Sequence, residues 1–525
     1  MKTSFWICTV LAATSASVVL AAKPAPIATV DGGIIRGSVT NGIASFKGIP
    51  FAAPPIGNLR WRAPQPARPW KGVRDATHYG HDCAQVPFPS DAAPLGTAPS
   101  EDCLVMNIWR PETIGAKKVP VLFWIYGGGF VNGGSSPDVY SGAALAKQGI
   151  MVVSFNYRLG RLGFFAHPAL SAEQAGKAGN YALMDQLAAL QWVKRNIARF
   201  GGDPAAVTIM GESAGGGSVT SLMNQPAARG LFHGAINMSG GGRDGGPLGT
   251  PRLLRKDQPN LPSAESVGLA FAQKIGVPGT DAAALKALRA LPADQIIDGF
   301  NLASLFTGAT GGPTGPVIDN VTVFGTNQQV LARSGQNKVP VMIGATSADI
   351  GFFPASTKDE VFATFGDKAD LARRLFDPGD ALPLQALIFK IGGIRGMIEP
   401  ARYVASRYAA AGQTVWHYRF GYVAESIRAP GMGAGHASDI PFFFNTVKAK
   451  YGDKLTAADI RAAAQISAYV VNFVKRGNPN GAGLPRWGKF DATQPVMDFT
   501  TDRGAVSGAD PWKVQLDLAE GLTKK

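Results

Sequence analysis

Four glycines surround one serine between residues 211 and 217, in the stretch TIMGESAGGGSV (208–219). A glycine inside a strand or helix costs about 0.5–1 kcal/mol relative to alanine, because its backbone loses more freedom on folding. Such a cluster indicates a backbone path that residues with side chains cannot follow. Apolar strand-forming residues precede the cluster, and a helix is expected after it. The sequence therefore predicts a sharp, strained strand-to-helix turn at Ser213.

Continuous apolar runs on both sides of this turn indicate the fold class. A run without alternation suits a strand that is buried on both faces of a parallel sheet. Such runs occupy residues 119–127, 149–159, 205–211, 230–240, 339–345 and 414–422. The segment 179–202 has helical spacing, and helical insertions are expected at about 255–300 and 355–415. This alternation predicts an α/β fold, with a large, mostly parallel central sheet flanked by helices. We expect one domain over residues 23–525.

The beginning of the chain has the layout of a secretory signal peptide, which we place at residues 1–22. A membrane anchor is the alternative, but the apolar stretch is short for a span and rich in small residues. Cys8 would leave with the signal, whereas Cys83 and Cys103 remain as an even pair. In an oxidising compartment we expect these two to form a disulfide. The sequence thus predicts a secreted or periplasmic protein whose mature chain has no integral membrane span.

The formal net charge of +14 raises the question of a nucleic-acid partner. Basic residues that bind a phosphate backbone usually gather in runs or on one face, whereas here they are spread thinly along the chain. We therefore expect no nucleic-acid partner and a basic surface. Electrostatic steering of an anionic substrate is the alternative. A hydrophobic share of 46% and a charged share of 17% are typical of a folded chain with a large core.

Ser213 needs a base, because a serine hydroxyl is a weak nucleophile until its proton is removed during attack. In folds with a G-x-S-x-G turn, the partners follow in the chain order serine, acid, histidine. Two histidines, His417 and His436, lie far enough along the chain. His417 is flanked by aromatic residues in a strand-like run, which indicates a structural role. His436 lies in the glycine-rich loop GMGAGHASDI, so we predict that it is the base.

The acid partner should lie on a loop that follows a strand. Asp349 comes directly after the apolar run 339–345 and is the predicted acid. Asp319 and Asp439 are the alternatives. We expect Asp319 to be a turn residue, and Asp439, three residues after His436, to order its own loop.

The glycines of YGGGF (126–130) end another apolar run. Their unhindered amides could point to one place, where they would stabilise an oxyanion. We predict Gly128 and Gly129 as donors, together with Ala214, the residue after the nucleophile. A simple flexible turn is the alternative. Because the sequence has no spaced His/Cys ligand set and no phosphate-binding loop, we expect no metal and no organic cofactor.

Longer blocks of the sequence resemble the type-B carboxylesterases, the cholinesterase-like family of α/β-hydrolases. The blocks stand in family order and cover the chain from near 30 to near 490. They read FKGIPFAAPPIGNLRWRAPQP, EDCLVMNIWRP, YGGGF, NYRLGRLGFF, GNYALMDQLAALQWVKRNIARFGGDPAAVTIMGESAGG, GAGHASDIPFFF and FVKRGNPN. The resemblance implies the α/β-hydrolase fold and a serine ester hydrolase that acts on small-molecule esters. Cys83 and Cys103 also resemble the N-terminal disulfide of the family.

Three departures from the family pattern bear on specificity. The usual acid is a glutamate in G-x-N-x-D-E-G, whereas this chain has GATSADIG with Asp349. The loop before EDCL has no tryptophan to hold a choline cation, which argues against choline esters. The basic loop 241–262 is idiosyncratic; we expect a surface insertion, with a part of the acyl pocket as the alternative.

The expected activity is therefore carboxylic ester hydrolysis through an acyl-enzyme, with Ser213, His436 and Asp349 as the triad. The same machinery specialised for polyanionic esters, lipids or amides is the nearer alternative. A non-catalytic binding protein on this fold is the remote one.

Overall fold

The computed structural model describes residues 24–88, 93–245, 249–306, 312, 315–351, 354–429, 431 and 433–522. The predicted signal peptide, residues 1–22, lies outside the described residues.

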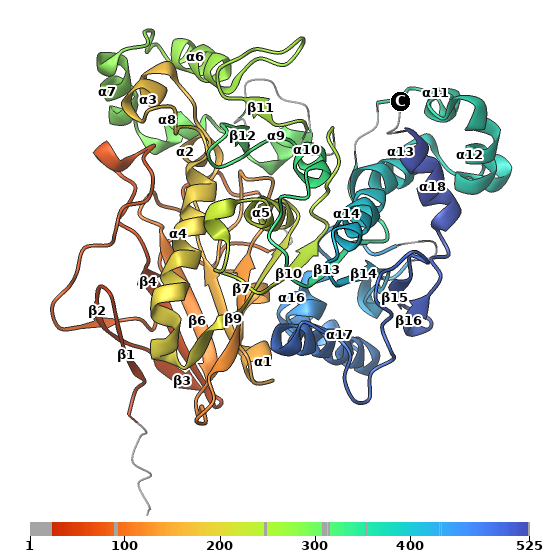
Figure 1. Cartoon of the computed structure of the whole chain (residues 1–525), viewed down its shortest axis with the longest axis horizontal. Coiled ribbons are helices and arrows are strands. Elements are labelled where there is room, and N and C mark those ends of the chain that lie inside the picture. Colours follow the sequence, from red (N-terminus) through yellow and green to blue (C-terminus); the bar gives the residue numbers. More distant parts are fainter. Residues whose placement is uncertain are drawn as a thin grey trace, which may run out of the picture.

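An 11-stranded sheet forms the centre of the molecule (Figure 1). From edge to edge its strands are β16 (Gly504–Gly508), β15 (Val496–Thr500), β14 (Val415–Phe420), β13 (Val341–Thr346), β10 (Gly234–Met238), β9 (Gly202–Glu212), β7 (Val119–Ile125), β8 (Met151–Phe155), β6 (Val105–Pro111), β4 (Ile43–Pro50) and β3 (Ser38–Thr40).

The middle of this sheet is parallel and its two margins are antiparallel. Strands β8, β7, β9, β10, β13, β14 and β15 pair in parallel, while β3, β4 and β6 on one side and β16 on the other pair antiparallel. The carboxyl ends of parallel strands meet at one edge of a sheet, and loops that leave those ends can converge on one site. The observed pairing of the strands confirms the mostly parallel sheet that the sequence predicts.

Helices cover the sheet because its central strands are apolar on both faces. Every residue of β8, β10, β13 and β14 is buried. The longer helices include α4 (Tyr181–Asn196), α5 (Ala214–Met223), α14 (Glu399–Ala410) and α17 (Ala457–Arg476). The others are α1 (Ala143–Ala146), α2 (Gly160–Gly163), α3 (Pro168–Glu173), α6 (Ala264–Lys274), α7 (Ala282–Ala290), α8 (Ala293–Ile297), α9 (Leu302–Phe306), α10 (Asn327–Ala332), α11 (Lys358–Ala363), α12 (Ala369–Phe376), α13 (Leu384–Gly393), α15 (Ile440–Phe443), α16 (Val447–Tyr451) and α18 (Lys513–Gly521).

The two predicted helical insertions are present. The first holds α6 to α8, and the second holds α11 to α14, with a π-helical turn at Ile394–Ile398 between α13 and α14. In Figure 1, α6 and α7 lie at one end of the molecule, and α11, α12 and α18 lie together at another. Both groups stand away from the central sheet, so the loops at its carboxyl edge lie between added helical elements.

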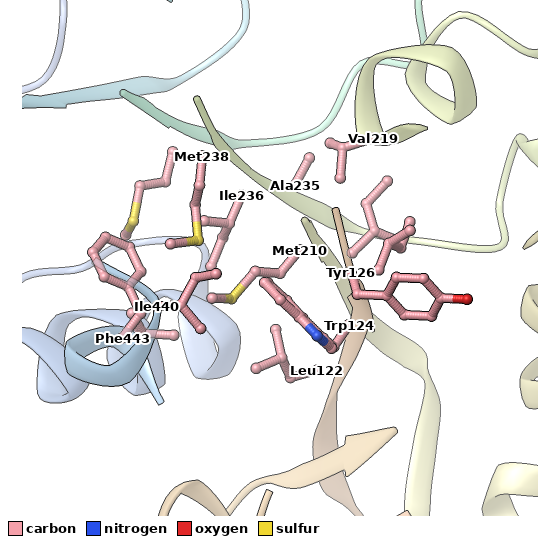
Figure 2. Close-up of a cluster of buried hydrophobic side chains, with 14 of the residues drawn as sticks. Leu122, Trp124, Tyr126, Met210, Val219, Ala235, Ile236, Met238, Ile440 and Phe443 are labelled. Carbon is pink, nitrogen blue, oxygen red and sulfur yellow. The ribbon is translucent and has the colours of Figure 1, made fainter. Parts of the chain in front are cut away.

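One part of the core anchors the segment that follows His436. Figure 2 shows strand residues packed together with two residues of the short helix α15. The strand residues are Leu122, Trp124, Met210, Ile236 and Met238, and the helix residues are Ile440 and Phe443. Since α15 begins four residues after His436, this packing fixes the position of the histidine loop relative to β9 and β10.

A smaller three-stranded sheet lies at the N-terminal side, formed by β1 (Ile27–Val30), β2 (Gly33–Arg36) and β5 (Val73–Asp75). Two short strands, β11 (Arg252–Leu253) and β12 (Val317–Ile318), make a separate pair.

A disulfide joins Cys83 and Cys103, which are 20 residues apart. Across the ranges that the structure describes, no helix is both long and apolar enough to span a lipid bilayer.

Candidate active site

Ser213 stands in a strained turn between β9 and α5. Its backbone has φ 57° and ψ −123°, a conformation that costs a non-glycine residue on the order of 1–3 kcal/mol. The turn requires glycine on both sides: a Cβ on Gly211 would overlap the carbonyl of Gly215, and one on Gly215 would overlap the carbonyl of Ile125. The amide of Ser213 donates to the carbonyl of Met238 on β10 at 2.9 Å. The glycine cluster therefore permits the close packing that holds the turn.

A chain of hydrogen bonds connects Ser213, His436 and Asp349. The Ser213 hydroxyl lies 2.8 Å from Nε2 of His436, and Nδ1 of His436 lies 2.6 Å from Oδ1 of Asp349. With the Nδ1 proton donated to the carboxylate, Nε2 faces the serine as an acceptor. The structure thus brings together the three residues that the sequence predicts, from loops that follow β9, β13 and β14.

Asp349 is held by four hydrogen bonds, although it is only 1% exposed. Besides His436, its donors are the amides of Thr346 at 3.0 Å and Ile350 at 2.8 Å, and the hydroxyl of Ser239 at 2.6 Å. Burial by itself would raise the pKa of this carboxyl, but His436, Ser239 and the Ile350 amide outweigh it and hold the pKa below its ordinary value. Asp349 is therefore an ionised, immobile partner of the imidazole.

The other candidate acids, Asp319 and Asp439, and the other candidate base, His417, do not belong to this chain of hydrogen bonds. Oδ1 of Asp319 accepts three backbone amides of its own turn, as expected. Asp439 is fully buried and contacts the Tyr418 hydroxyl at 3.3 Å. Burial first, and then the charge of Asp349, raise the pKa of Asp439 to about 7. His417 is buried in β14 against Phe490, and desolvation lowers its pKa to about 4.

Two polar residues of this site, Glu212 and Ser239, were not predicted from the sequence. Glu212 is 3% exposed, and its Oε1 lies 3.3 Å from Nε2 of His436. Ser239 follows β10 and donates to the Asp349 carboxylate. Glu212 ends β9 and Ser239 follows β10, the strand that pairs with both β9 and β13. Their placement at the carboxyl ends of parallel strands was the available signal.

His436 is surrounded by negative charge. Burial lowers its pKa, but Glu212 and Asp349 act in the opposite direction, and the net effect is to raise the pKa of His436 to about 9. The two carboxylates favour the imidazolium, which is the state that the base reaches when it accepts the serine proton. The electrostatic field of the site therefore supports proton transfer from Ser213 to His436.

The glycine loop lies directly beside the serine. Gly128 has φ 102° and Gly129 has φ 61°, both in the left-handed region that favours glycine. The Ala214 amide is at the first turn of α5, where helical N–H groups lack a partner within the helix. Within the described parts of the chain, no group accepts a hydrogen bond from the amides of Gly128, Gly129 or Ala214. The three predicted donors are therefore available to a ligand at Ser213.

Two cavities open onto Ser213. The larger is about 600 Å³, with Glu212, His436 and the three loop glycines in its wall. The smaller is about 100 Å³ and lies against Gly217, Gly240–Gly242, Arg243 and Met397. Met397, in the π-helical turn, lines both.

The loop 241–262 was expected to be a surface insertion, and for its first part this prediction is wrong. Gly241, Gly242, Arg243 and Asp244 line the smaller cavity. Arg243 is drawn inward because its guanidinium forms two hydrogen bonds, of 2.6 and 2.7 Å, with the buried carboxylate of Glu399. This part of the loop thus shapes the site next to the serine.

The arrangement has the parts needed for acyl transfer: a nucleophile, a base with its orienting acid, and free amides for an oxyanion. In the part of the chain that the structure describes, no group of three or more His, Cys, Asp or Glu residues is placed to hold a metal ion.

Comparison with known proteins agrees with this geometry. A family model described as "Carboxylesterase family" matches residues 24–378 and 394–512. Fumonisin B1 esterase of Sphingopyxis macrogoltabida is 34% identical over 494 residues, which are 91% of this chain and 86% of that protein. Para-nitrobenzyl esterase of Bacillus subtilis (strain 168) is 34% identical over 479 residues, 86% of this chain and 90% of that protein. A solved PNB esterase structure aligns with a TM-score of 0.78 at 30% identity, covering 94% of this chain and 99% of that one. The resemblance and the fold class predicted from the sequence are confirmed.

Replacing Glu212 with Gln should lower the pKa of His436, because the neutral amide no longer stabilises the imidazolium. In the unmodified protein we expect the imidazole to titrate above its ordinary value of 6.5, near 9. NMR titration of histidine-labelled protein measures this, with the signal assigned by its loss in His436→Ala. Glu425→Gln, which removes an exposed carboxylate, is the matched control and should leave the pKa unchanged. An equal pKa in Glu212→Gln and the unmodified protein would contradict the charge balance described above.

Proposed function

The chain belongs to the carboxylesterase family, and on that premise we propose that it hydrolyses carboxylic esters through a covalent acyl-enzyme on Ser213. The hydrogen-bonded chain from Ser213 through His436 to Asp349 is the observation that carries this proposal. It supplies a nucleophile and a base in contact, and a buried acid that fixes the base.

In the first half of the reaction, Ser213 Oγ attacks the ester carbonyl carbon while its proton passes to Nε2 of His436. The carbonyl oxygen becomes an oxyanion, which the amides of Gly128, Gly129 and Ala214 stabilise; one such donor is typically worth 10²–10³ in rate. The tetrahedral intermediate then collapses. His436 returns the proton to the leaving alkoxide, and the acyl group stays on Ser213 as an ester.

In the second half, a water molecule takes the place of the alcohol. His436 accepts a proton from this water as its oxygen attacks the acyl carbon, and the same amides stabilise the second oxyanion. Collapse expels Ser213 Oγ, which regains its proton from His436. The products are a carboxylic acid and an alcohol, and the enzyme returns to its starting state.

Three buried groups support His436 during these transfers. Asp349 orients the imidazole and stabilises its protonated form, and Ser239 holds the far oxygen of that carboxylate. Glu212 adds a second negative charge near Nε2. Because only a neutral imidazole can accept the serine proton, kcat/KM should rise with pH through the pKa of His436.

The larger cavity indicates a small-molecule ester whose non-reacting part is accommodated beside the serine. Its walls are mainly apolar, with Val139, Tyr140, Leu302 and Leu305 among them. Relatives named for fumonisin B1 and para-nitrobenzyl substrates are consistent with room for large groups. The non-catalytic alternative is not favoured, because all parts of the machinery are present.

We further propose that the mature chain is exported, to the periplasm or outside the cell. The signal-like residues 1–22 and the disulfide between Cys83 and Cys103 support this location. Disulfides persist in oxidising compartments and are rare in the cytosol.

Labelling with a fluorophosphonate tests whether Ser213 is activated. We expect rapid formation of one adduct, mapped to Ser213 by mass spectrometry, because the base removes the hydroxyl proton during attack on phosphorus. His436→Ala should slow labelling by a factor on the order of 10³ or more. A correctly folded protein that forms no adduct, or forms it equally fast without His436, would refute the proposal.

The assignment of the acid is tested by comparing two buried aspartates near the histidine. Asp349→Asn should lower kcat for a para-nitrophenyl ester by a factor on the order of 10⁴, because the amide favours the wrong imidazole tautomer. Asp439→Asn is the matched control. It removes a carboxyl of raised pKa that does not contact Nδ1, and kcat should change by less than about tenfold. A larger loss in Asp439→Asn than in Asp349→Asn would reverse the assignment.

A further inference from the structure

The glycine loop, residues 127–133, depends on its neighbours for its shape. Glycine has more backbone freedom to lose than any other residue, so Gly128 and Gly129 keep one conformation only where other groups restrain them. The restraint comes from residues that follow them in the chain. The carbonyl of Gly128 accepts hydrogen bonds from the amides of Val131 at 3.1 Å and Asn132 at 2.9 Å. The position of the oxyanion donors therefore depends on how Asn132 is held.

Gln85 connects the glycine loop to the segment that contains the disulfide. Its buried side-chain amide makes four hydrogen bonds. Oε1 accepts from Nδ2 of Asn132 at 3.0 Å and from the amide of Gly133 at 2.9 Å. Nε2 donates to the carbonyl of Gly133 at 2.6 Å and to the carbonyl of Cys83 at 2.9 Å. Two donated and two accepted bonds use the full capacity of a glutamine amide.

Asn132 is the residue through which Gln85 acts on Gly128. Its side chain is buried, and besides its bond to Gln85 it donates to the carbonyl of Val86 at 2.7 Å. Its Oδ1 accepts from the amide of Leu302, at the start of α9, at 2.7 Å. The backbone of Asn132 holds the Gly128 carbonyl, while its side chain is held by Gln85. One residue thus separates Gln85 from an oxyanion donor.

The segment that carries Gln85 is itself firmly anchored. Cys83 is joined to Cys103 by the disulfide. The buried carboxylate of Asp82 accepts hydrogen bonds from the amide of Ser135, at 3.0 Å, and from the hydroxyl of Ser136. Gln85 therefore fixes the glycine loop to a part of the chain that cannot move freely.

We propose that Gln85 is a positioning residue of the oxyanion site, which keeps the amides of Gly128 and Gly129 in place without contacting the substrate. Gln85 is not among the described residues that line the two cavities at Ser213. This inference rests on the proposed ester hydrolysis and deepens it. Donors stabilise an oxyanion because they are oriented before the reaction begins. A misplacement of about 1 Å can lower a rate by a factor on the order of 10².

The test compares para-nitrophenyl butyrate with its thiono analogue, in which sulfur replaces the carbonyl oxygen. Sulfur is a weak hydrogen-bond acceptor, so hydrolysis of the thiono ester depends less on the amide donors. Ser213 and His436 act on both esters. The ratio of kcat/KM for the oxo over the thiono ester therefore reports on the oxyanion site. A smaller share of correctly folded protein lowers both rates equally and leaves this ratio unchanged.

Two variants remove the connection. Gln85→Met has a side chain of similar length that makes none of the four hydrogen bonds. Gln85→Asn keeps a neutral amide but is one methylene too short to join both segments, and it decides the test if Gln85→Met does not fold.

The matched control is Gln413→Met. Gln413 is also buried, and its amide makes three hydrogen bonds, with Gln336, Asn337 and Val339. It precedes β14 and so lies at the amino edge of the parallel strands, away from the site.

We expect the oxo-to-thiono ratio to fall about 10- to 100-fold in Gln85→Met, and to fall in Gln85→Asn as well. The ratio should change less than about twofold in Gln413→Met. The pH dependence of kcat/KM should keep its position in all three variants, because the groups around His436 are untouched. An unchanged ratio in a folded Gln85 variant, or an equal fall in Gln413→Met, would overturn the positioning role. Absence of hydrolysis of both esters by the unmodified protein would instead overturn the proposed function.

Discussion

The backbone conformation of Ser213 is the constraint on which the rest of the site depends. A positive φ at a serine is unfavourable, so it persists only where the surroundings leave no alternative. Here the surroundings are the tight contacts of Gly211 and Gly215 and the amide bond from Ser213 to β10. These contacts aim the hydroxyl away from the sheet and set the first amide of α5 beside it. The same turn thus positions the nucleophile and one oxyanion donor.

The balance of charge around His436 is the second constraint. Asp349 and Glu212 are both within 3.3 Å of the imidazole nitrogens, and a third carboxyl, Asp439, is buried nearby. Three full negative charges in so small a buried volume would repel one another strongly. Burial raises the pKa of Asp439 to about 7, so near neutral pH a large share of this group carries its proton. The site therefore keeps enough negative charge to stabilise the imidazolium without holding all three carboxylates ionised.

Much of this arrangement could be predicted from the sequence because it is encoded locally. The continuous apolar runs indicate buried parallel strands, and the glycines around Ser213 indicate the turn. Chain order and loop position then single out His436 and Asp349, which the structure brings together. Glu212 and Ser239 could not be assigned in this way, since their proximity to His436 and Asp349 depends on the lateral order of β9, β10, β13 and β14 in the sheet. The position of Arg243 depends on Glu399, 156 residues further along, so no local pattern could show that its loop turns inward.

Direct detection of the acyl-enzyme tests the central claim, that Ser213 carries the acyl group between the two halves of the reaction. The protein is mixed with a para-nitrophenyl ester, quenched in acid within milliseconds, digested and analysed by mass spectrometry. We predict that the peptide containing Ser213 gains the mass of the acyl group, and that it does so as para-nitrophenol is released. Ester hydrolysis at full rate with no acyl group on Ser213, or with the group on another residue, would contradict this account.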